Sequence, residues 1–218
     1  MNSSVIIFPG SNCDRDIDVA LKKFQIDNKM VWHDESVLPK TDLVVLPGGF
    51  SYGDYLRTGA IARFSPIMNS VINAANKGVP VIGICNGFQI LLECGLLPGA
   101  LINNKNIKFL SKKVVLKVET NETMFSNKLN IGDKLEMPIA HKQGNYIASE
   151  NVIKDLIDYN RIVFKYENNP NGSMVDIAGI INENGNVLGM MPHPERACEL
   201  ILGSDDGKAI FESMLGKC

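Results

Sequence analysis

Val79-Pro-Val-Ile-Gly-Ile-Cys-Asn-Gly-Phe-Gln-Ile-Leu-Leu-Glu-Cys-Gly95 is the stretch that decides how this chain of 218 residues folds. It begins as an apolar run over residues 79–84, short enough to be a buried strand. Apolar residues then recur at helical spacing until Gly95, which suits the position just after a helix. Cys85 therefore stands at the corner between strand and helix, with glycines two residues before and after it. The pattern predicts a nucleophile elbow with Cys in place of Ser.

The position of Cys85 favours chemistry at its sulfur. A helix N-terminus favours a thiolate over a thiol, and the N–H of Asn86 is placed to face a developing oxyanion. The alternative is that Cys85 is a packing residue, because Cys is among the most buried residue types. A catalytic role requires a base and an orienting acid elsewhere in the chain.

Composition limits the kind of protein this can be. Hydrophobic residues make up 45% of the chain, charged residues make up 21%, and the net charge is -2. This balance is typical of a globular protein, and it lacks the excess of basic residues expected of a nucleic-acid-binding protein. No apolar run approaches the roughly 18 residues of a membrane span, and the first residues lack a signal-peptide pattern. The five cysteines are scattered, without metal-type spacing. We expect a reduced, cytoplasmic protein without nucleic acid, membrane or metal.

The first half of the chain alternates strands with helices. Apolar runs predict strands at residues 5–8, 29–33 and 43–46, and helical periodicity follows the first strand and begins again at Ser65 and Pro66. This alternation predicts an α/β fold with a mostly parallel sheet flanked by helices, like the flavodoxin-like folds. Ligands of such sheets bind at the carboxyl ends of the strands. Loops 10–12 and 48–50 and Cys85 should therefore lie at one edge.

The second half has a different pattern. We expect it to be antiparallel and laid against the parallel sheet, within a single domain spanning residues 1–218. Residues 183–186 give a two-residue hairpin signal. Ser204 is the expected N-cap of a last helix, with Asp205 and Asp206 in its first turn. The expected strands cover residues 113–118, 135–141, 161–166, 177–181 and 187–191.

The base and the acid are found in Met191-Pro-His-Pro-Glu195, which follows the final expected strand. Prolines hold the preceding residues in extended conformations, and positions i and i+2 then project to the same side. Glu195 can therefore orient His193, and Cys85 completes a nucleophile, base and orienter. The alternative is a loop histidine beside a charge. Of the other two histidines, His33 is expected to be structural, and His141 lies either at the rim of the site or in a surface loop.

These motifs together resemble the class I, triad-type glutamine amidotransferases. The similarity extends beyond the elbow and the His-Pro-Glu segment, and its motifs run from residue 9 to residue 196. Within that family the similarity is strongest to the glutaminase subunits that serve a separate ATP-dependent synthetase of purine biosynthesis. The further motifs are Pro9-Gly-Ser-Asn-Cys-Asp14, Leu46-Pro-Gly-Gly-Phe-Ser-Tyr-Gly-Asp-Tyr-Leu-Arg57, and Pro138-Ile-Ala-His141.

The resemblance implies roles for individual residues. Cys85 would attack the side-chain amide of glutamine, His193 would transfer protons, and Glu195 would orient the imidazole. The N–H groups of Gly49 and Asn86 would hold the oxyanion. The substrate-binding and oxyanion region would also include Gly48, Phe50, Gln89 and His141.

The resemblance also implies partners. Ammonia would pass to a larger synthetase subunit, with a further small subunit in the complex, and ATP and Mg would bind only to the synthetase. This chain itself has no phosphate-binding loop motif and is expected to hold no cofactor. The segment from Phe50 to Arg57 is the candidate docking surface, or else an ordinary loop. His141-Lys-Gln-Gly144 departs from the His-Gly-Glu-Gly common in the family, which leaves the roles of Lys142 and Gln143 open.

Other proteins share parts of this pattern. A γ-glutamyl hydrolase or cysteine peptidase of the same superfamily has an elbow Cys and a His, and a related glyoxalase-like or chaperone protein usually lacks the His-Pro-Glu segment. A catalytically silent regulatory subunit is a third alternative, which the intact triad disfavours. The remaining cysteines are interpreted as structural: Cys13, Cys94, Cys198 and Cys218.

Overall fold

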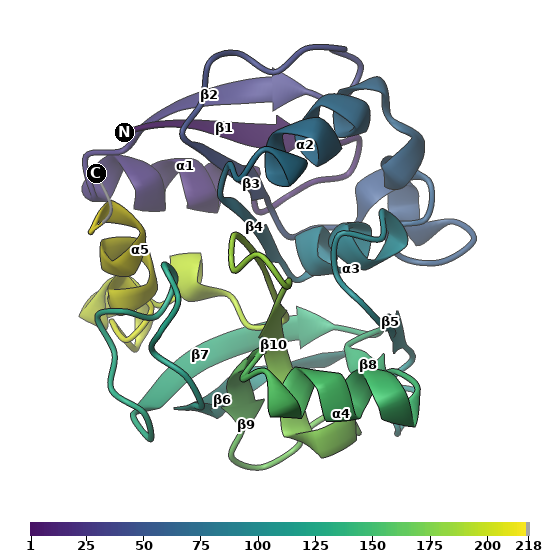
Figure 1. Ribbon diagram of the computed structural model, residues 1–218, viewed down its shortest axis with the longest axis vertical. Helices are drawn as coiled ribbons and strands as arrows, with labels where there is room; N and C mark the ends of the chain where they lie inside the picture. Colours follow the sequence, from purple (N-terminus) through teal and green to yellow (C-terminus); the bar gives the residue numbers. More distant parts are fainter. Residues whose placement is uncertain (217–218) are drawn as a thin grey trace.

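A nine-stranded sheet forms the centre of the computed structural model, which describes residues 1–216 (Figure 1). Its strand order is β2-β1-β3-β4-β11-β10-β9-β6-β7. A separate two-stranded sheet pairs β5 (Ala100–Ile102) with β8 (Asn145–Ile147). The strands of the large sheet are β1 (Asn2–Ile7), β2 (Asp27–Trp32), β3 (Leu43–Leu46), β4 (Val81–Ile84), β6 (Leu110–Val118), β7 (Lys134–His141), β9 (Ile162–Tyr166), β10 (Ile177–Ile181) and β11 (Val187–Met190).

Helices cover both sides of the central strands. In Figure 1, α1 (Asp14–Lys23) and α5 (Lys208–Leu215) lie on one side, and α2 (Pro66–Asn76) and α3 (Asn86–Glu93) lie on the other. The rings of Phe24 and Phe211 stack with centroids 5.3 Å apart and so join α1 to α5. Helix α4 (Glu150–Asp158) lies over the antiparallel half, and none of the helices within residues 1–216 could cross a membrane.

The parallel half of the sheet explains the position of the site. Strands β2, β1, β3, β4 and β11 pair in parallel, in that order. Every residue of β3, β4 and β11 is buried, as expected where helices cover both faces of a sheet. Because these strands run in the same direction, the loops that follow them all emerge at one edge. The predicted α/β fold, with antiparallel strands in the C-terminal half, is confirmed.

The second half was expected to lie against the parallel sheet, but its strands are arranged differently. Its antiparallel strands continue the parallel sheet edge to edge, from β11 through β10 and β9 to β6 and β7. The predicted hairpin joins β10 to β11, but Asn182 donates its N–H to the Val187 carbonyl, which closes a turn longer than two residues. Asn182 Oδ1 accepts hydrogen bonds from the N–H groups of Asn186 and Val187, which supports this longer turn.

Two helices differ from the sequence interpretation. Helix α4 was not predicted, although Ser149 accepts a hydrogen bond from the N–H of Val152 as its N-cap. Helix α5 begins at Lys208 rather than just after Ser204, because the Asp206 carboxylate accepts a hydrogen bond from the Glu136 N–H of β7. The last helix is therefore held by a contact with a distant strand instead of by its expected cap.

The elbow depends on a close approach between α3 and β3. A Cβ added to Gly87 would lie 1.9 Å from the Leu46 carbonyl oxygen, and one added to Gly83 would lie 2.7 Å from the Gly87 carbonyl carbon. Cys85, between these glycines, has φ 51° and ψ -104°, outside the regions that most residues occupy. Gly95 ends the helix segment with φ 71°, as predicted from the sequence. Backbone contact thus holds the nucleophile in a strained conformation.

Replacing Gly87 with Ala should therefore be costly. We expect Gly87→Ala to lower the free energy of unfolding by about 3 kcal/mol or more, since β3 cannot move away without disturbing the sheet. Gly78→Ala is the matched control, because Gly78 has φ 88° but nothing within 4 Å of an added Cβ. It should cost only the left-handed backbone strain of roughly 1–2 kcal/mol. Denaturant unfolding measures both, and equal losses would contradict the close-approach explanation.

Candidate active site

Four loops meet at the carboxyl ends of the parallel strands. The loop after β1 is joined to the loop after β3 by the Cys13 N–H, which donates to the Gly48 carbonyl at 3.3 Å, and by the Phe50 N–H, which donates to the Gly10 carbonyl at 3.0 Å. Cys85 follows β4, and its N–H donates to the Met190 carbonyl at the end of β11. The three loops predicted to share an edge therefore do so, together with the segment carrying His193.

His193 and Glu195 form a buried pair. The Nδ1 of His193 lies 2.6 Å from a Glu195 carboxylate oxygen, and the exposed fractions of the two residues are 1% and 4%. The His193 N–H donates to the Pro138 carbonyl of β7, which holds the backbone of this segment. With Nδ1 directed at Glu195, the other ring nitrogen, Nε2, has no hydrogen-bond partner within residues 1–216. It is available for proton transfer.

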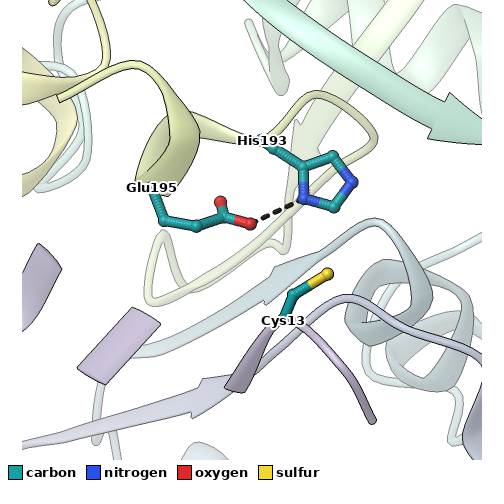
Figure 2. A group of neighbouring side chains, drawn as sticks. All are labelled: Cys13, His193 and Glu195. Carbon is teal, nitrogen blue, oxygen red and sulfur yellow. Dashed lines mark hydrogen bonds and ion pairs between the residues drawn. The ribbon is translucent and has the colours of Figure 1, made fainter. Parts of the chain in front are cut away.

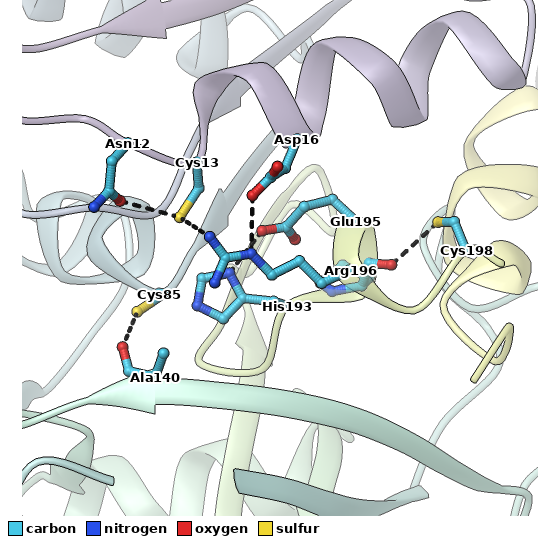
Figure 3. Close-up of polar contacts among 10 residues, drawn as sticks. Asn12, Cys13, Asp16, Cys85, Ala140, His193, Glu195, Arg196 and Cys198 are labelled. Carbon is cyan, nitrogen blue, oxygen red and sulfur yellow. Dashed lines mark hydrogen bonds and ion pairs between the residues drawn. The ribbon is translucent and has the colours of Figure 1, made fainter. Parts of the chain in front are cut away.

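The Cys85 side chain lies against the same imidazole. A Cβ added to Gly48 would stand 2.7 Å from His193 Cε1 and 3.4 Å from Cys85 Cβ, so the two side chains face the same glycine. The Cys85 thiol donates weakly to the Ala140 carbonyl of β7 at 3.7 Å (Figure 3). Cys85 and His193 also line one small cavity of about 80 Å³, together with Gly49 and Phe50.

Electrostatics favours a charged His193. Burial alone would lower the pKa of His193, but the Glu195 carboxylate and the Cys85 sulfur outweigh it and raise this pKa well above the ordinary value. The neighbouring His141 behaves in the opposite way, because burial and the positive charge of His193 lower its pKa to about 4. The site therefore supports an imidazolium at His193, next to the Cys85 sulfur, beside a neutral His141.

Two backbone N–H groups are available for an oxyanion. Gly49 has φ 141°, and a side chain there would lie 2.7 Å from the backbone nitrogen of Asn12, so this position requires glycine. Asn86 is the first residue of α3, where an N–H has no acceptor within the helix. Within residues 1–216 neither group donates to the protein. Phe50 covers this side of the cavity, and its ring stacks on Phe109 with centroids 6.3 Å apart.

A chain of amide hydrogen bonds connects the loop after β3 with the elbow helix. The Ser51 N–H donates to Asn86 Oδ1 at 3.1 Å, and Asn86 Nδ2 donates to Gln89 Oε1 at 2.9 Å. Gln89 Nε2 in turn donates to the Gln143 carbonyl at 2.6 Å. The Gln143 side chain accepts from the hydroxyl and the N–H of Thr58. Gln89 thus lies where the sequence interpretation placed it, one turn past Cys85, but its amide is engaged by protein groups.

His141 is a buried residue at the end of β7, and lies neither at the rim of the site nor in a surface loop. Its exposed fraction is 3%, and its Nδ1 lies 3.1 Å from the side-chain oxygen of Asn104. Gly144 packs against the imidazole so closely that an added Cβ would stand 2.2 Å from it. The backbone of Lys142 accepts from the Asn104 N–H. Asn104, which the sequence interpretation missed, therefore organises the turn carrying Gln143.

The structure adds Arg196 as a neighbour of the site and gives a partner to Cys13, which the sequence interpretation placed close to a rim loop without one (Figure 3). Cys13 is the residue just before α1, and its sulfur accepts a hydrogen bond from Arg196 Nη2 at 3.1 Å. Arg196 Nε donates to Asp16 at 2.9 Å. Cys13 was interpreted as structural because no motif in the sequence connects it with residue 193. Cys218, which was given the same interpretation, lies outside the described residues.

Two larger cavities lie away from Cys85. Cavities of about 440 and 530 Å³ share Asp155, Arg161 and Glu183, near the opposite ends of β4 and β11. Arg161 forms ion pairs there with both acidic residues. Neither cavity is lined by a cysteine or a histidine, so the groups needed for nucleophilic chemistry are gathered around Cys85 and not there.

Comparison with known families agrees with this geometry. Residues 1–208 match the model of the CobB/CobQ-like glutamine amidotransferase domain. The chain belongs to this glutamine amidotransferase family. The resemblance drawn from the motifs is thus confirmed, and the elbow Cys, the His–Glu pair and the free N–H groups are found in a glutamine amidotransferase domain.

Solved structures support the family and the fold. A structure of PurLQS from Thermotoga maritima is 46% identical, with a TM-score of 0.92, over 98% of this chain and 97% of that chain. A glutamine amidotransferase from Thermotoga maritima is 17% identical, with a TM-score of 0.60, over 98% and 90% of the two chains. A CTPS glutaminase domain with bound acivicin from Trypanosoma brucei is 11% identical, with a TM-score of 0.63, over 100% and 95%. The latter two show only a shared fold.

Replacing Glu195 with Gln should lower the pKa of His193. The raised pKa keeps the imidazolium at neutral pH and releases its proton only as the pH rises through that value. Without the carboxylate, burial prevails and the proton should be lost at a lower pH, by at least about one pH unit. NMR titration of the His193 ring measures this shift. Glu199→Gln, which removes an exposed partner of Lys23, is the control and should leave the titration unchanged.

Replacing Asn86 with Asp should break the amide chain while preserving the fold. The new carboxylate can still accept from Ser51, and a helix N-terminus tolerates negative charge, but the donor to Gln89 is lost. We expect a 10- to 100-fold loss in kcat/KM for glutamine hydrolysis, matching a cost of roughly 1–3 kcal/mol for an unsatisfied buried group. Asn69→Asp, in the first turns of α2 and exposed, should retain full activity. Equal activities would show that the chain of amides is catalytically irrelevant.

Proposed function

We propose that this chain is the glutaminase subunit of phosphoribosylformylglycinamidine synthase, an enzyme of purine biosynthesis. The observation that carries the proposal is the near-full-length match to PurLQS at 46% identity. Membership of the glutamine amidotransferase family and the buried Cys, His and Glu constellation support it. The reaction is hydrolysis of the glutamine side chain to glutamate and ammonia, with the ammonia delivered to a synthetase subunit.

The first half of the reaction forms a thioester. The Cys85 thiolate attacks the side-chain carboxamide carbon of glutamine, and the carbonyl oxygen becomes an oxyanion held by the N–H groups of Gly49 and Asn86. Each such donor contributes roughly 10²- to 10³-fold in rate. The His193 imidazolium then gives its proton to the nitrogen, the C–N bond breaks, and ammonia leaves. The raised pKa of His193 suits this step, since the proton donor is charged before attack.

The second half releases glutamate. Neutral His193 takes a proton from water, the hydroxide attacks the thioester carbon, and the C–S bond breaks to restore the Cys85 thiolate. Glu195 keeps the imidazole in one orientation throughout, because its carboxylate lies 2.6 Å from Nδ1. Proton transfer of this kind contributes roughly 10²- to 10⁴-fold in rate.

The residues around Cys85 and His193 form the substrate pocket in this proposal. Gly48 leaves the space between Cys85 and His193 that a side chain would fill, and Phe50 forms a wall of the cavity. Gln89 contacts the glutamine substrate after exchanging its bond to the turn at Gln143. His141 acts indirectly, because it supports the turn that carries Gln143. Its neutral form suits a buried position beside the charged His193.

The partners follow from the reaction. Ammonia released here is useful only to an acceptor enzyme, so the chain acts with a synthetase subunit that carries ATP and Mg, and with a further small subunit, in the cytoplasm. The docking surface includes the segment from Phe50 to Arg57, where Tyr55 and Leu56 are 75% and 90% exposed. Several backbone angles in this segment are unusual, with positive φ at Tyr52, Asp54 and Leu56. A partner bound there would contact the loop that carries the Gly49 N–H.

The alternatives are not favoured. A γ-glutamyl hydrolase or a cysteine peptidase would share the elbow, but the identity and coverage of the PurLQS match favour the glutaminase component of an amidotransferase. A silent regulatory subunit would not need a buried His193 with its Nε2 free beside Cys85.

A diazo-ketone analogue of glutamine tests the proposal directly. We expect one adduct on Cys85, mapped by mass spectrometry, that is prevented by excess glutamine and absent from Cys85→Ser. Cys94→Ala, on the far end of the elbow segment, is the control and should label normally. Labelling should become faster when the synthetase subunit is present. Absence of an adduct both with and without the synthetase would refute the glutaminase assignment.

A further inference from the structure

A thiol, an imidazole and a carboxylate meet beside the catalytic centre. One donor atom each from Cys13, His193 and Glu195 lies within 4.8 Å of the others, and all three residues are buried (Figure 2). The catalytic steps use His193 and Glu195, but they leave the Cys13 sulfur without a role. This cluster draws on residues far apart in the sequence, from the loop after β1 and the segment after β11.

Two polar atoms of the cluster lack protein partners. His193 Nε2 and Glu195 Oε2 are buried and accept or donate no hydrogen bond within residues 1–216. The lack of a partner at Nε2 is explained by its role as the base, but the reaction gives no role to Oε2. Buried polar atoms normally find a partner, so a carboxylate oxygen left over next to a thiol indicates a group that can be recruited by a ligand.

The donor set and spacing fit a zinc ion. Zinc binds sulfur at about 2.3 Å and nitrogen or oxygen at about 2.0–2.2 Å, so tetrahedral ligands lie roughly 3.3–3.8 Å apart. Donors already within 4.8 Å need to move by only about 1 Å toward the metal, or by a small side-chain rotation. Sulfur and imidazole ligands select zinc and similar metals, whereas magnesium and calcium prefer oxygen.

The surrounding charges permit a bound cation. Arg196 contacts the Cys13 sulfur at 3.1 Å and its positive charge opposes a metal, but Asp16 pairs with that guanidinium at 2.9 Å. The site itself would supply two negative ligands, the Cys13 thiolate and the Glu195 carboxylate, which balance the charge of Zn²⁺.

We propose that Cys13, His193 and Glu195 form a zinc site that inhibits the enzyme. Zinc binding releases two protons to solvent, one from the Cys13 thiol and one from the ligating ring nitrogen of the His193 imidazolium. The metal then occupies both the base and its orienting carboxylate, with water or the Cys85 thiolate as the fourth ligand. The zinc is an inhibitor, not a cofactor of the reaction. The binding site stands on the geometry alone, and only its inhibitory effect rests on the proposed glutaminase function.

Direct binding tests the site without using activity. Full-length chains with Cys85→Ala, which removes the nucleophile as a ligand, are titrated with Zn²⁺ against a chromophoric chelator. We expect one tight site per chain, and Co²⁺ should give a sulfur-to-metal absorption band. Adding Cys13→Ala should weaken binding by roughly 100-fold or more and abolish the band, because the only thiolate ligand is lost. Adding Cys94→Ala instead should change neither.

Activity provides the second test. In the otherwise unaltered chain, submicromolar free Zn²⁺ should inhibit glutamine hydrolysis reversibly, with recovery on adding a chelator, and Cys94→Ala should be equally sensitive. The inhibition constant for Cys13→Ser, compared with its own zinc-free activity, should rise at least tenfold. If Cys13→Ala does not fold, Cys13→Ser replaces it in the binding assay. Unchanged zinc affinity in the Cys13 variants would overturn the proposal, whereas binding without inhibition would overturn only its regulatory effect.

Discussion

The close contact between the elbow helix and strand β3 is the constraint on which the site depends. Gly87 touches the Leu46 carbonyl where no side chain could fit, and this contact holds Cys85 at a positive φ with the helix N-terminus behind it. The same principle operates at Gly48 and Gly49, where the backbone of the oxyanion loop lies against Cys13, Asn12 and the imidazole. Packing of backbone on backbone therefore determines where the thiol, the base and the N–H donors meet.

Burial then sets the chemistry of these groups. A lone histidine at the position of His193 would lose its charge on desolvation, but Glu195 lies close enough to reverse that effect. Within residues 1–216 no carboxylate raises the pKa of His141, and it remains neutral in a similarly buried position. Two histidines in one region thus have pKa values shifted in opposite directions, because Glu195 and the Cys85 sulfur act on His193, whereas burial and the charge of His193 act on His141. The dependence is reciprocal, since either member of the buried pair would be left as an uncompensated group without the other.

The sequence allowed prediction of features that depend on local pattern. Gly83, Cys85 and Gly87 identified the elbow, and two prolines indicated that His193 and Glu195 face the same side. The parallel strands and their shared edge followed from alternation of strands with helices. Cys13 and Asn104 could not be assigned in this way, because their contacts join loops distant in the sequence through space left by Gly48 and Gly144. Helix α5 starts late for a similar reason, since Asp206 is held by β7.

Strand β7 shows why the antiparallel half belongs to the active site. It is the last strand of the sheet, and in an antiparallel strand the carbonyls of residues i and i+2 point to the same side. Pro138 and Ala140 are such a pair, and their carbonyls accept from His193 and from Cys85 instead of from another strand. A proline is tolerated at Pro138 because the N–H it lacks would also face this unpaired edge. His193 and Cys85 therefore occupy the edge that could have paired with another chain. Because both are bonded to β7, their positions depend on the second half of the fold.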